Sequence, residues 1–148
     1  MENLGLDFWN GKTVFITGHT GFKGSWLCKI LYDAGAKVYG FSLPLSEQNK
    51  LFASIMESNV EKSYFGDIND EEYLQAALLE SQPGIIFHLA AQPLVMDSYK
   101  DPIKTFETNI MGTARLILYS SKLESLKSLV NVTSDKCYAN NNLATPFL

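Results

Sequence analysis

Short runs of β-branched and aromatic residues alternate along this chain with longer segments in which apolar residues recur every three or four positions. The short runs are typical of buried strands, and the longer spacing is typical of helices that cover a sheet. The pattern predicts five strands, over residues 13–17, 37–41, 63–65, 85–89 and 128–133. Because strands and helices alternate, we expect an α/β fold with a doubly wound, mostly parallel sheet and helices on both faces.

Two helices are predicted before the third strand. The first follows the first strand, and Gly35 is placed to end it. Its expected apolar stripe consists of Trp26, Leu27, Ile30 and Leu31. After the second strand, a polar, proline-containing loop over residues 42–50 leads to a short helix near residues 51–56.

Two further helices are predicted later in the chain. One begins with Asn69 as its N-cap and has Glu72 at the reciprocal position of a capping box. The other begins at Asp101, which is followed by proline, and keeps helical spacing to about Ser121. Residues 90–100 are expected to form a loop at the carboxyl edge of the sheet, where such folds bind ligands.

Three glycines, Gly18, Gly21 and Gly24, follow the first strand and precede the first helix. In such a turn the backbone can approach a pyrophosphate closely, and the unpaired N–H groups of the helix point at it. The sequence therefore predicts a dinucleotide site. The alternative is that the glycines only shape a turn and let the helix pack on the strand.

Other polar residues near the glycine turn bear on the same ligand. Lys23 can pair with a phosphate and His19 can cover a ribose, although both can equally be exposed turn side chains. The second strand ends at Ser42 without the acidic residue that often holds the adenine ribose, so both NAD and NADP fit. Asp67 either contacts the adenine or is a solvated turn residue.

Polar residues after the later strands complete the candidate site. His88 lies in a buried run and is expected to be a hydrogen-bonded core histidine rather than a catalyst. Asn109, on an otherwise apolar helix face, is expected to bridge backbone groups near the site. Thr133, Ser134, Asp135 and Lys136 follow the fifth strand, where they face the same crevice as a nicotinamide or form a capped turn with two solvated charges.

Length and composition fit one compact domain, since 46% of the 148 residues are hydrophobic. A net charge of −4 argues against nucleic acid or an anionic membrane as a partner. The sequence has neither an apolar run long enough to span a bilayer nor a basic leader at Met1, so we expect a cytoplasmic protein. Cys28 and Cys137 are expected to be free thiols, with no metal site.

Several segments together resemble the extended short-chain dehydrogenases/reductases, and within them the CDP-glucose 4,6-dehydratases. These segments are TGHTGFKGSW, GDI, FHLAAQPLV, TNIMGT and NVTSDKCY, spread over residues 8–138. The resemblance implies a Rossmann-like fold that binds NAD, with NADP as a second possibility. The cofactor-binding residues that it implies are Gly18, His19, Gly21, Phe22, Lys23, Gly24, Ser42, Asp67, Ile68, Leu89, Ala90, Ala91, Gln92, Asn109 and Thr133.

The resemblance also implies a reaction on a nucleotide sugar, in which NAD⁺ takes hydride from C4, water leaves across C5 and C6, and hydride returns to C6. Ser134 would then hydrogen-bond the C4 oxygen, and Asp135 would protonate the departing C6 hydroxyl. Lys136 would assist proton removal at C5, which requires a substantially neutral amine.

The family also has a Tyr-x-x-x-Lys pair, which the sequence lacks. We therefore expect residues 1–138 to be an incomplete dinucleotide-binding domain, residues 139–148 a divergent tail, and the substrate domain to be absent. Little activity is expected from this chain alone. The homodimer usual for full-length members is doubtful here, and exposed apolar surface is expected. The alternatives are a non-catalytic dinucleotide-binding module and a fragment of a related NAD-dependent sugar-nucleotide epimerase.

Overall fold

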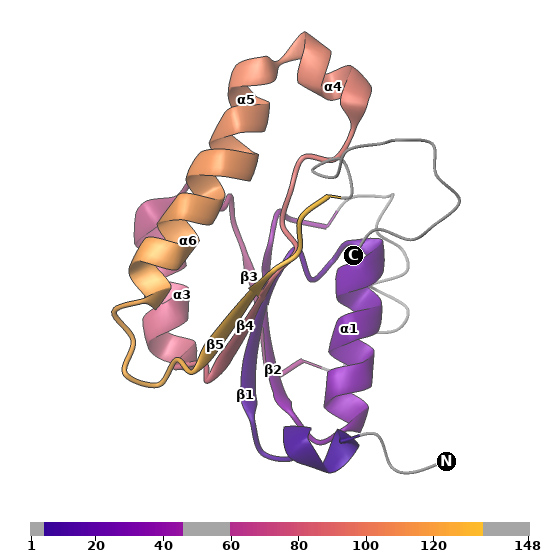
Figure 1. Ribbon diagram of the computed structural model, residues 1–148, viewed down its shortest axis with the longest axis vertical. Helices are drawn as coiled ribbons and strands as arrows, with labels where there is room; N and C mark the ends of the chain where they lie inside the picture. Colours follow the sequence, from indigo (N-terminus) through magenta and orange to yellow (C-terminus); the bar gives the residue numbers. More distant parts are fainter. Residues whose placement is uncertain (1–4, 46–59, 135–148) are drawn as a thin grey trace, which may run out of the picture.

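A computed structural model describes residues 5–45 and 60–134 of the chain. Five parallel strands form one sheet in the order β3-β2-β1-β4-β5, with helices on both faces (Figure 1). The strands are β1 (Thr13–Thr17), β2 (Lys37–Ser42), β3 (Lys62–Phe65), β4 (Ile85–His88) and β5 (Ser128–Asn131). The predicted α/β fold is confirmed, although β5 ends two residues before the expected position 133.

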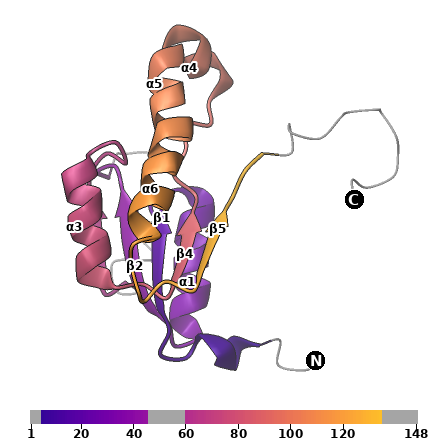
Figure 2. The same ribbon diagram turned by 60° about the vertical axis from the view of Figure 1, so that its left-hand side comes forward.

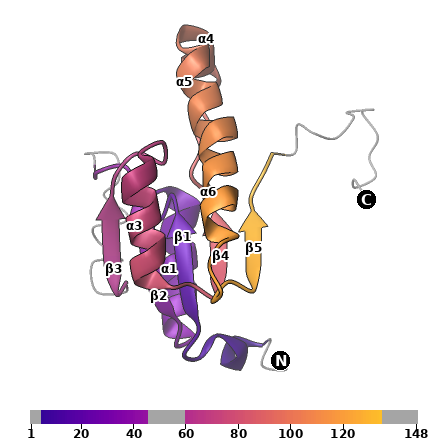
Figure 3. The ribbon, with the colours of Figure 1, turned by 90° about the vertical axis from the view of Figure 1, so that its left-hand side faces the viewer.

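The helices divide between the two faces of the sheet. Helix α1 (Phe22–Asp33) covers one face, and α3 (Glu71–Ser81) and α6 (Thr113–Ser120) cover the other (Figure 3). One core cluster consists of Val14, Ile16, Cys28, Leu31, Ala36 and Val38. The other consists of Phe15, Phe41, Tyr64, Ile68, Leu74, Ala77, Leu78, Ile86 and Leu116. Consecutive β1 residues contribute to opposite clusters because strand side chains alternate between faces.

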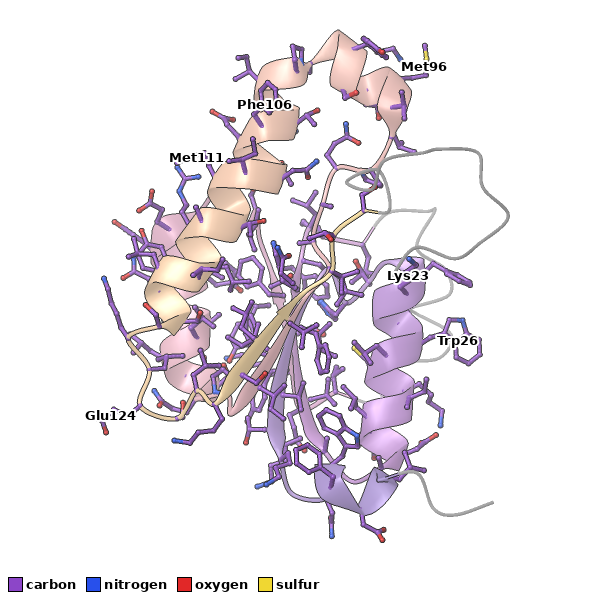
Figure 4. The ribbon with its side chains drawn as sticks, in the orientation of Figure 1. Lys23, Trp26, Met96, Phe106, Met111 and Glu124 are labelled. Atoms are coloured by element: carbon purple, nitrogen blue, oxygen red, sulfur yellow. The ribbon has the colours of Figure 1, made fainter. Side chains whose placement is uncertain are left out.

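The face through which α1 packs differs from the expected stripe. Its buried residues are Gly24, Ser25, Cys28 and Leu31, mostly small, so the helix can approach the sheet closely. Trp26 is 46% exposed and Ile30 is 53% exposed. Figure 4 shows Trp26 pointing away from the sheet. The prediction that Trp26 and Ile30 belong to the buried stripe was therefore wrong.

The start of α3 lies one residue later than predicted. The N-cap is Asp70, whose carboxylate accepts a hydrogen bond from the Tyr73 N–H at 3.1 Å. Asn69 instead donates its backbone N–H to Asp67 Oδ1 at 2.9 Å, in a turn that precedes the helix. Two adjacent Asx residues compete for the capping position here, and the Asp67 turn has already engaged Asn69.

Between β4 and β5 the chain forms a long helical arm. It consists of α4 (Val95–Lys100), α5 (Pro102–Phe106), the π-helical turn η3 (Glu107–Gly112) and α6. Asp101 caps α5 through a hydrogen bond from the Lys104 N–H at 3.0 Å, which confirms the predicted helix start. The expected loop over residues 90–100 was wrong in its second half, since α4 forms there.

The end of this arm projects beyond the sheet (Figure 2). Phe106 and Ile110 on it are each more than half exposed, at 57% and 56%. At the other end of the molecule a short 3₁₀ helix, η1 (Leu6–Trp9), precedes β1. Of the described helices, none is both long and apolar enough to cross a bilayer. The predicted helix near residues 51–56 and Cys137 lie outside the described residues.

Replacing the observed N-cap should destabilise the protein more than replacing the expected capping-box residue. Asp70→Ala removes the acceptor for the Tyr73 N–H and should lower the free energy of unfolding by about 1 kcal/mol. The matched control is Glu72→Ala in the same first turn, which should cost less than half as much. Urea unfolding measures both. A larger loss for Glu72→Ala would show that the capping box forms instead.

Candidate functional site

The glycine turn joins the carboxyl end of β1 to the start of α1. Gly18 has a left-handed backbone with φ of 69°, and its N–H donates to the Phe41 carbonyl oxygen at 2.8 Å. The Gly21 N–H donates to the Gly18 carbonyl oxygen at 3.0 Å. Gly21 is the N-cap of α1, and no side chain caps the helix there. The amides of the first helical turn and the positive end of the helix dipole are thus arranged to bind an anion.

Two positions in this turn have no room for a side chain. A Cβ on Gly18 would lie 2.8 Å from the Ala90 nitrogen, and a Cβ on Gly24 would overlap the Gly18 carbonyl oxygen. Only glycine therefore lets the turn, α1 and the chain leaving β4 approach one another this closely. Gly21 is less constrained, since its Cβ would come no closer than 3.3 Å to the Gly18 carbonyl oxygen.

His19 is fully buried at the carboxyl end of the sheet. Its ring packs against Gly40, where a Cβ would clash with the imidazole, and its Nε2 lies 3.0 Å from Ser63 Oγ. Burial lowers the pKa of His19 to about 4, against the opposing effect of a hydrogen bond with the Phe41 backbone. The alternative that His19 is an exposed turn side chain was therefore wrong. His19 instead links the glycine turn to β2 and β3.

Phe22 and Lys23 lie at the first turn of α1. Both side chains are exposed, and Figure 4 shows Lys23 at the amino end of the helix, on the same side as the glycine turn. The Lys23 side chain is long and flexible, so its ammonium group can approach an anion that the amides at this end of α1 bind. A phosphate contact by Lys23 remains a prediction.

The ends of β2 and β3 hold the residues expected near the adenine half of a dinucleotide. The Ser42 hydroxyl donates to the Leu43 carbonyl oxygen at 3.0 Å. One oxygen of Asp67 accepts hydrogen bonds from both Asn69 nitrogens, at 2.9 and 3.1 Å, so the carboxylate shapes its own turn. Ile68 is buried against Gly112. The turn role of Asp67 is present in the structure, and its contact with adenine remains a prediction.

His88 occupies the end of β4 and is 2% exposed. Its Nδ1 lies 2.6 Å from Thr17 Oγ1 on β1, and its Nε2 lies 2.9 Å from Thr113 Oγ1 on α6. Burial lowers the pKa of His88 to about 4. The prediction of a hydrogen-bonded core histidine is confirmed.

Asn109, in the π-helical turn, holds the chain that leaves β4. Its Oδ1 accepts the Gln92 N–H at 2.7 Å, and its Nδ2 donates to the Gln92 carbonyl oxygen at 3.1 Å. The Gln92 side chain also donates to Thr105 Oγ1 at 3.1 Å. The predicted bridge from Asn109 to backbone groups is confirmed, and it fixes the position of residues 90–92 at the carboxyl edge of the sheet.

The residues after β5 approach the same edge. Asn131 pairs with His88 in the parallel register, so Thr133 and Ser134 lie beyond the carboxyl ends of both strands. Both are exposed. Asp135 and Lys136, the other two residues proposed for chemistry, lie outside the described residues. The sequence reasoning overlooked Thr17 and Thr113, although a threonine ending a buried strand next to a glycine turn was an available signal.

Comparisons with known proteins agree with this architecture. The family model for GDP-mannose 4,6 dehydratase matches residues 15–147. The chain is 48% identical over 134 residues to the CDP-glucose 4,6-dehydratase of Salmonella typhimurium, covering 90% of the chain and 37% of that protein. The chain thus spans less than half the length of this relative.

Two solved structures are similar to this chain over most of its length. An epimerase from Methanothermobacter thermautotrophicus is 29% identical with a TM-score of 0.82, over 97% of this chain and 41% of that one. The UDP-glucose 4-epimerase of Thermus thermophilus, solved in complex with NAD, is 27% identical with a TM-score of 0.66. That similarity covers 78% of this chain and 35% of the epimerase chain.

The two buried histidines should remain neutral at physiological pH. The sequence holds only these two, and burial lowers the pKa of each from 6.5 to about 4. In a proton NMR titration, neither imidazole should shift between pH values of about 7.5 and 5.5. A resonance that titrates near its ordinary pKa in the folded protein would contradict the observed burial.

The same pKa shifts set the direction of the pH dependence of stability. Between pH 6.5 and about 4 the unfolded histidines bind protons that the folded ones do not. The free energy of unfolding therefore has its full value, as far as these histidines are concerned, above pH 6.5. It falls as the pH falls toward 4, by at most on the order of 3 kcal/mol for each histidine. Denaturant unfolding across this range measures the loss, with His88→Asn reducing it.

Proposed function

Because the chain belongs to the GDP-mannose 4,6-dehydratase family, we propose that it is the dinucleotide-binding part of a sugar-nucleotide 4,6-dehydratase that acts on CDP-glucose. The substrate is proposed from the Salmonella relative, whose name gives CDP-glucose 4,6-dehydratase. We assign residues 1–138 to this domain and NAD to it as the cofactor. The Thermus relative, solved with NAD, supports that cofactor.

The cradle formed by Gly18 and Gly24 is the single observation that carries the proposal. At both positions a Cβ would collide with backbone, so glycine lets the turn pack closely while the start of α1, which no side chain caps, lies beside it. A pyrophosphate would bring negative charge to the amides and the positive dipole end at the start of α1. The residues present therefore fit a dinucleotide, with Lys23 as a further cation for the phosphates.

The two halves of the dinucleotide would lie along different strand ends. Ser42, Asp67 and Ile68, after β2 and β3, would border the adenosine half. Residues 89–92 and Thr133, after β4 and β5, would border the nicotinamide half, with Asn109 holding Gln92 in place. His19 would support the glycine turn from beneath rather than cover a ribose, because its ring is buried against Gly40.

The residues proposed for chemistry are those that follow β5. When bound, the nicotinamide would take hydride from C4 of the sugar and return it to C6. Ser134 would hold the C4 oxygen through its hydroxyl, Asp135 would give a proton to the departing C6 hydroxyl, and Lys136, as a neutral amine, would take the C5 proton. The C4 hydroxyl proton would go to a general base other than these three residues, the place that the tyrosine of the Tyr-x-x-x-Lys pair takes in the family. Lys136 would return its proton to C5 as hydride reaches C6, and one water leaves with the proton from Asp135.

The epimerase relatives favour a second candidate function. The Methanothermobacter structure, named as an epimerase, shares the fold at a TM-score of 0.82, and the Thermus structure is a UDP-glucose 4-epimerase. An epimerase returns the hydride to C4 and loses no water. A dinucleotide-binding module without catalysis is the third alternative. The three differ in what happens to the sugar.

Dinucleotide binding should depend on the bare glycine at position 24. Gly24→Ala places a methyl group on the Gly18 carbonyl oxygen and should raise the dissociation constant for NAD⁺ by at least about tenfold. Calorimetric titration with NAD⁺ and NADP⁺ measures the effect. Gly84→Ala is the control, since its Cβ would meet no atom closer than 3.8 Å and should bind as the wild type does. Equal binding by both variants would remove the glycine cradle from the site.

Turnover distinguishes the three candidate functions. The sequence contains no Tyr-x-x-x-Lys pair, so hydride transfer is expected to be slow and the protein is used in excess over CDP-glucose, with NAD⁺ present. Mass spectrometry should find a sugar nucleotide that has lost one water. An epimer of unchanged mass would support the epimerase. Unaltered CDP-glucose would support the non-catalytic module only if a preparation to which a full-length relative's Tyr-x-x-x-Lys segment has been joined also leaves CDP-glucose unaltered.

A further inference from the structure

A continuous chain of hydrogen bonds crosses the molecule beneath the nicotinamide end of the proposed site. Thr17 Oγ1 accepts the N–H groups of Leu89 and Ala90, both at 3.2 Å, and the Leu89 N–H is shared with the Thr17 carbonyl oxygen at 3.1 Å. The same hydroxyl lies 2.6 Å from His88 Nδ1, and His88 Nε2 lies 2.9 Å from Thr113 Oγ1. The Thr113 hydroxyl in turn donates to the Asn109 carbonyl oxygen at 2.8 Å.

Counting donors and acceptors along this chain fixes where the imidazole proton lies. The bonds at Thr17 leave the tautomer of His88 open, because the Leu89 N–H is shared with the Thr17 carbonyl oxygen and one lone pair of the hydroxyl is only partly used. The Thr113 hydroxyl hydrogen is used on Asn109, so its oxygen accepts from His88 Nε2, which must carry the proton. In the neutral imidazole Nδ1 is then unprotonated, and it accepts the hydrogen of the Thr17 hydroxyl.

We propose that His88 is a positioning residue, which, in its Nε2–H tautomer between Thr17 and Thr113, fixes the backbone of residues 89–92 for the nicotinamide half of the dinucleotide. As an acceptor at Nδ1, His88 orients the Thr17 hydroxyl so that its oxygen accepts the Ala90 N–H and shares the Leu89 N–H with the Thr17 carbonyl oxygen. This inference rests on the proposed function for its ligand, but the backbone it describes can be measured without any ligand.

The far end of the same chain holds the other side of this segment. Thr113 bonds to the Asn109 backbone, and the Asn109 side chain clamps both the N–H and the carbonyl of Gln92. Residues 89–92 are thus held at their start through Thr17 and at their end through Asn109, with His88 joining the two supports. Because every member is satisfied and buried or half-buried, loss of one hydrogen bond should be felt along the whole segment.

The test uses Thr113→Val, which keeps the shape of the side chain but removes the acceptor for His88 Nε2. Thr113→Ser restores a hydroxyl at the same place. Ser120→Ala is the matched control, because it removes a buried hydroxyl from the same helix that bonds only locally, to the Ile117 carbonyl oxygen at 3.3 Å. The readouts are ¹⁵N imidazole NMR, hydrogen exchange of the Leu89 and Ala90 amides, and NAD⁺ titration.

In the wild type, the imidazole spectrum should show a proton on Nε2 and none on Nδ1. Thr113→Val should populate the other tautomer and weaken NAD⁺ binding by roughly fivefold, with recovery in Thr113→Ser. It should also speed exchange of the Ala90 amide more than that of Leu89, whose N–H keeps its bond to the Thr17 carbonyl oxygen. A wild-type proton on Nδ1 would overturn the proposal even if the valine variant failed to fold.

The proposal for His88 would also be overturned if the Ala90 amide exchanged its hydrogen at the same rate in Thr113→Val as in Ser120→Ala. If the wild type bound no NAD⁺ at all, the proposed function would fail, while the tautomer and exchange measurements would still decide whether His88 positions the segment.

Discussion

The close approach of bare backbone at the carboxyl end of β1 is the constraint on which this molecule depends. Gly18 lies against the chain leaving β4, and Gly24 brings α1 against Gly18, so three segments meet where no side chain fits. The contact explains why α1 packs through Gly24, Ser25 and Cys28 rather than through Trp26. It also places the uncapped start of α1 at the edge where the parallel strands end.

Buried, neutral histidines hold the two flanks of this meeting point. His19 anchors the glycine turn to Gly40 on β2 and Ser63 on β3. On the other flank, His88 joins β1, β4 and α6 through two threonine hydroxyls. Burial lowers the pKa of both to about 4, so each acts as a fixed donor and acceptor rather than as a charge. The site is therefore preorganised, because the buried histidines hold in place the backbone that would contact the ligand.

Local patterns in the sequence were sufficient to predict the sheet, the glycine turn and the hydrogen bonds of Asn109 to backbone groups. Apolar runs mark buried strands whatever their partners, and a lone asparagine on an apolar helix face needs polar partners. The remainder depended on tertiary contacts. The burial of His19 could not be predicted from its neighbours in the sequence, because the residue that makes room for its ring, Gly40, is distant in the sequence. Likewise, the choice of Asp70 over Asn69 as N-cap depends on the Asp67 turn.

The most direct test of the central claim is a map of backbone amide NMR shifts on adding NAD⁺ to the folded chain. If the bare turn and the start of α1 hold a pyrophosphate, the largest shifts fall on residues 18–25, with a second group at residues 89–92. Shifts confined to other parts of the chain, or none at saturating NAD⁺, would contradict the account.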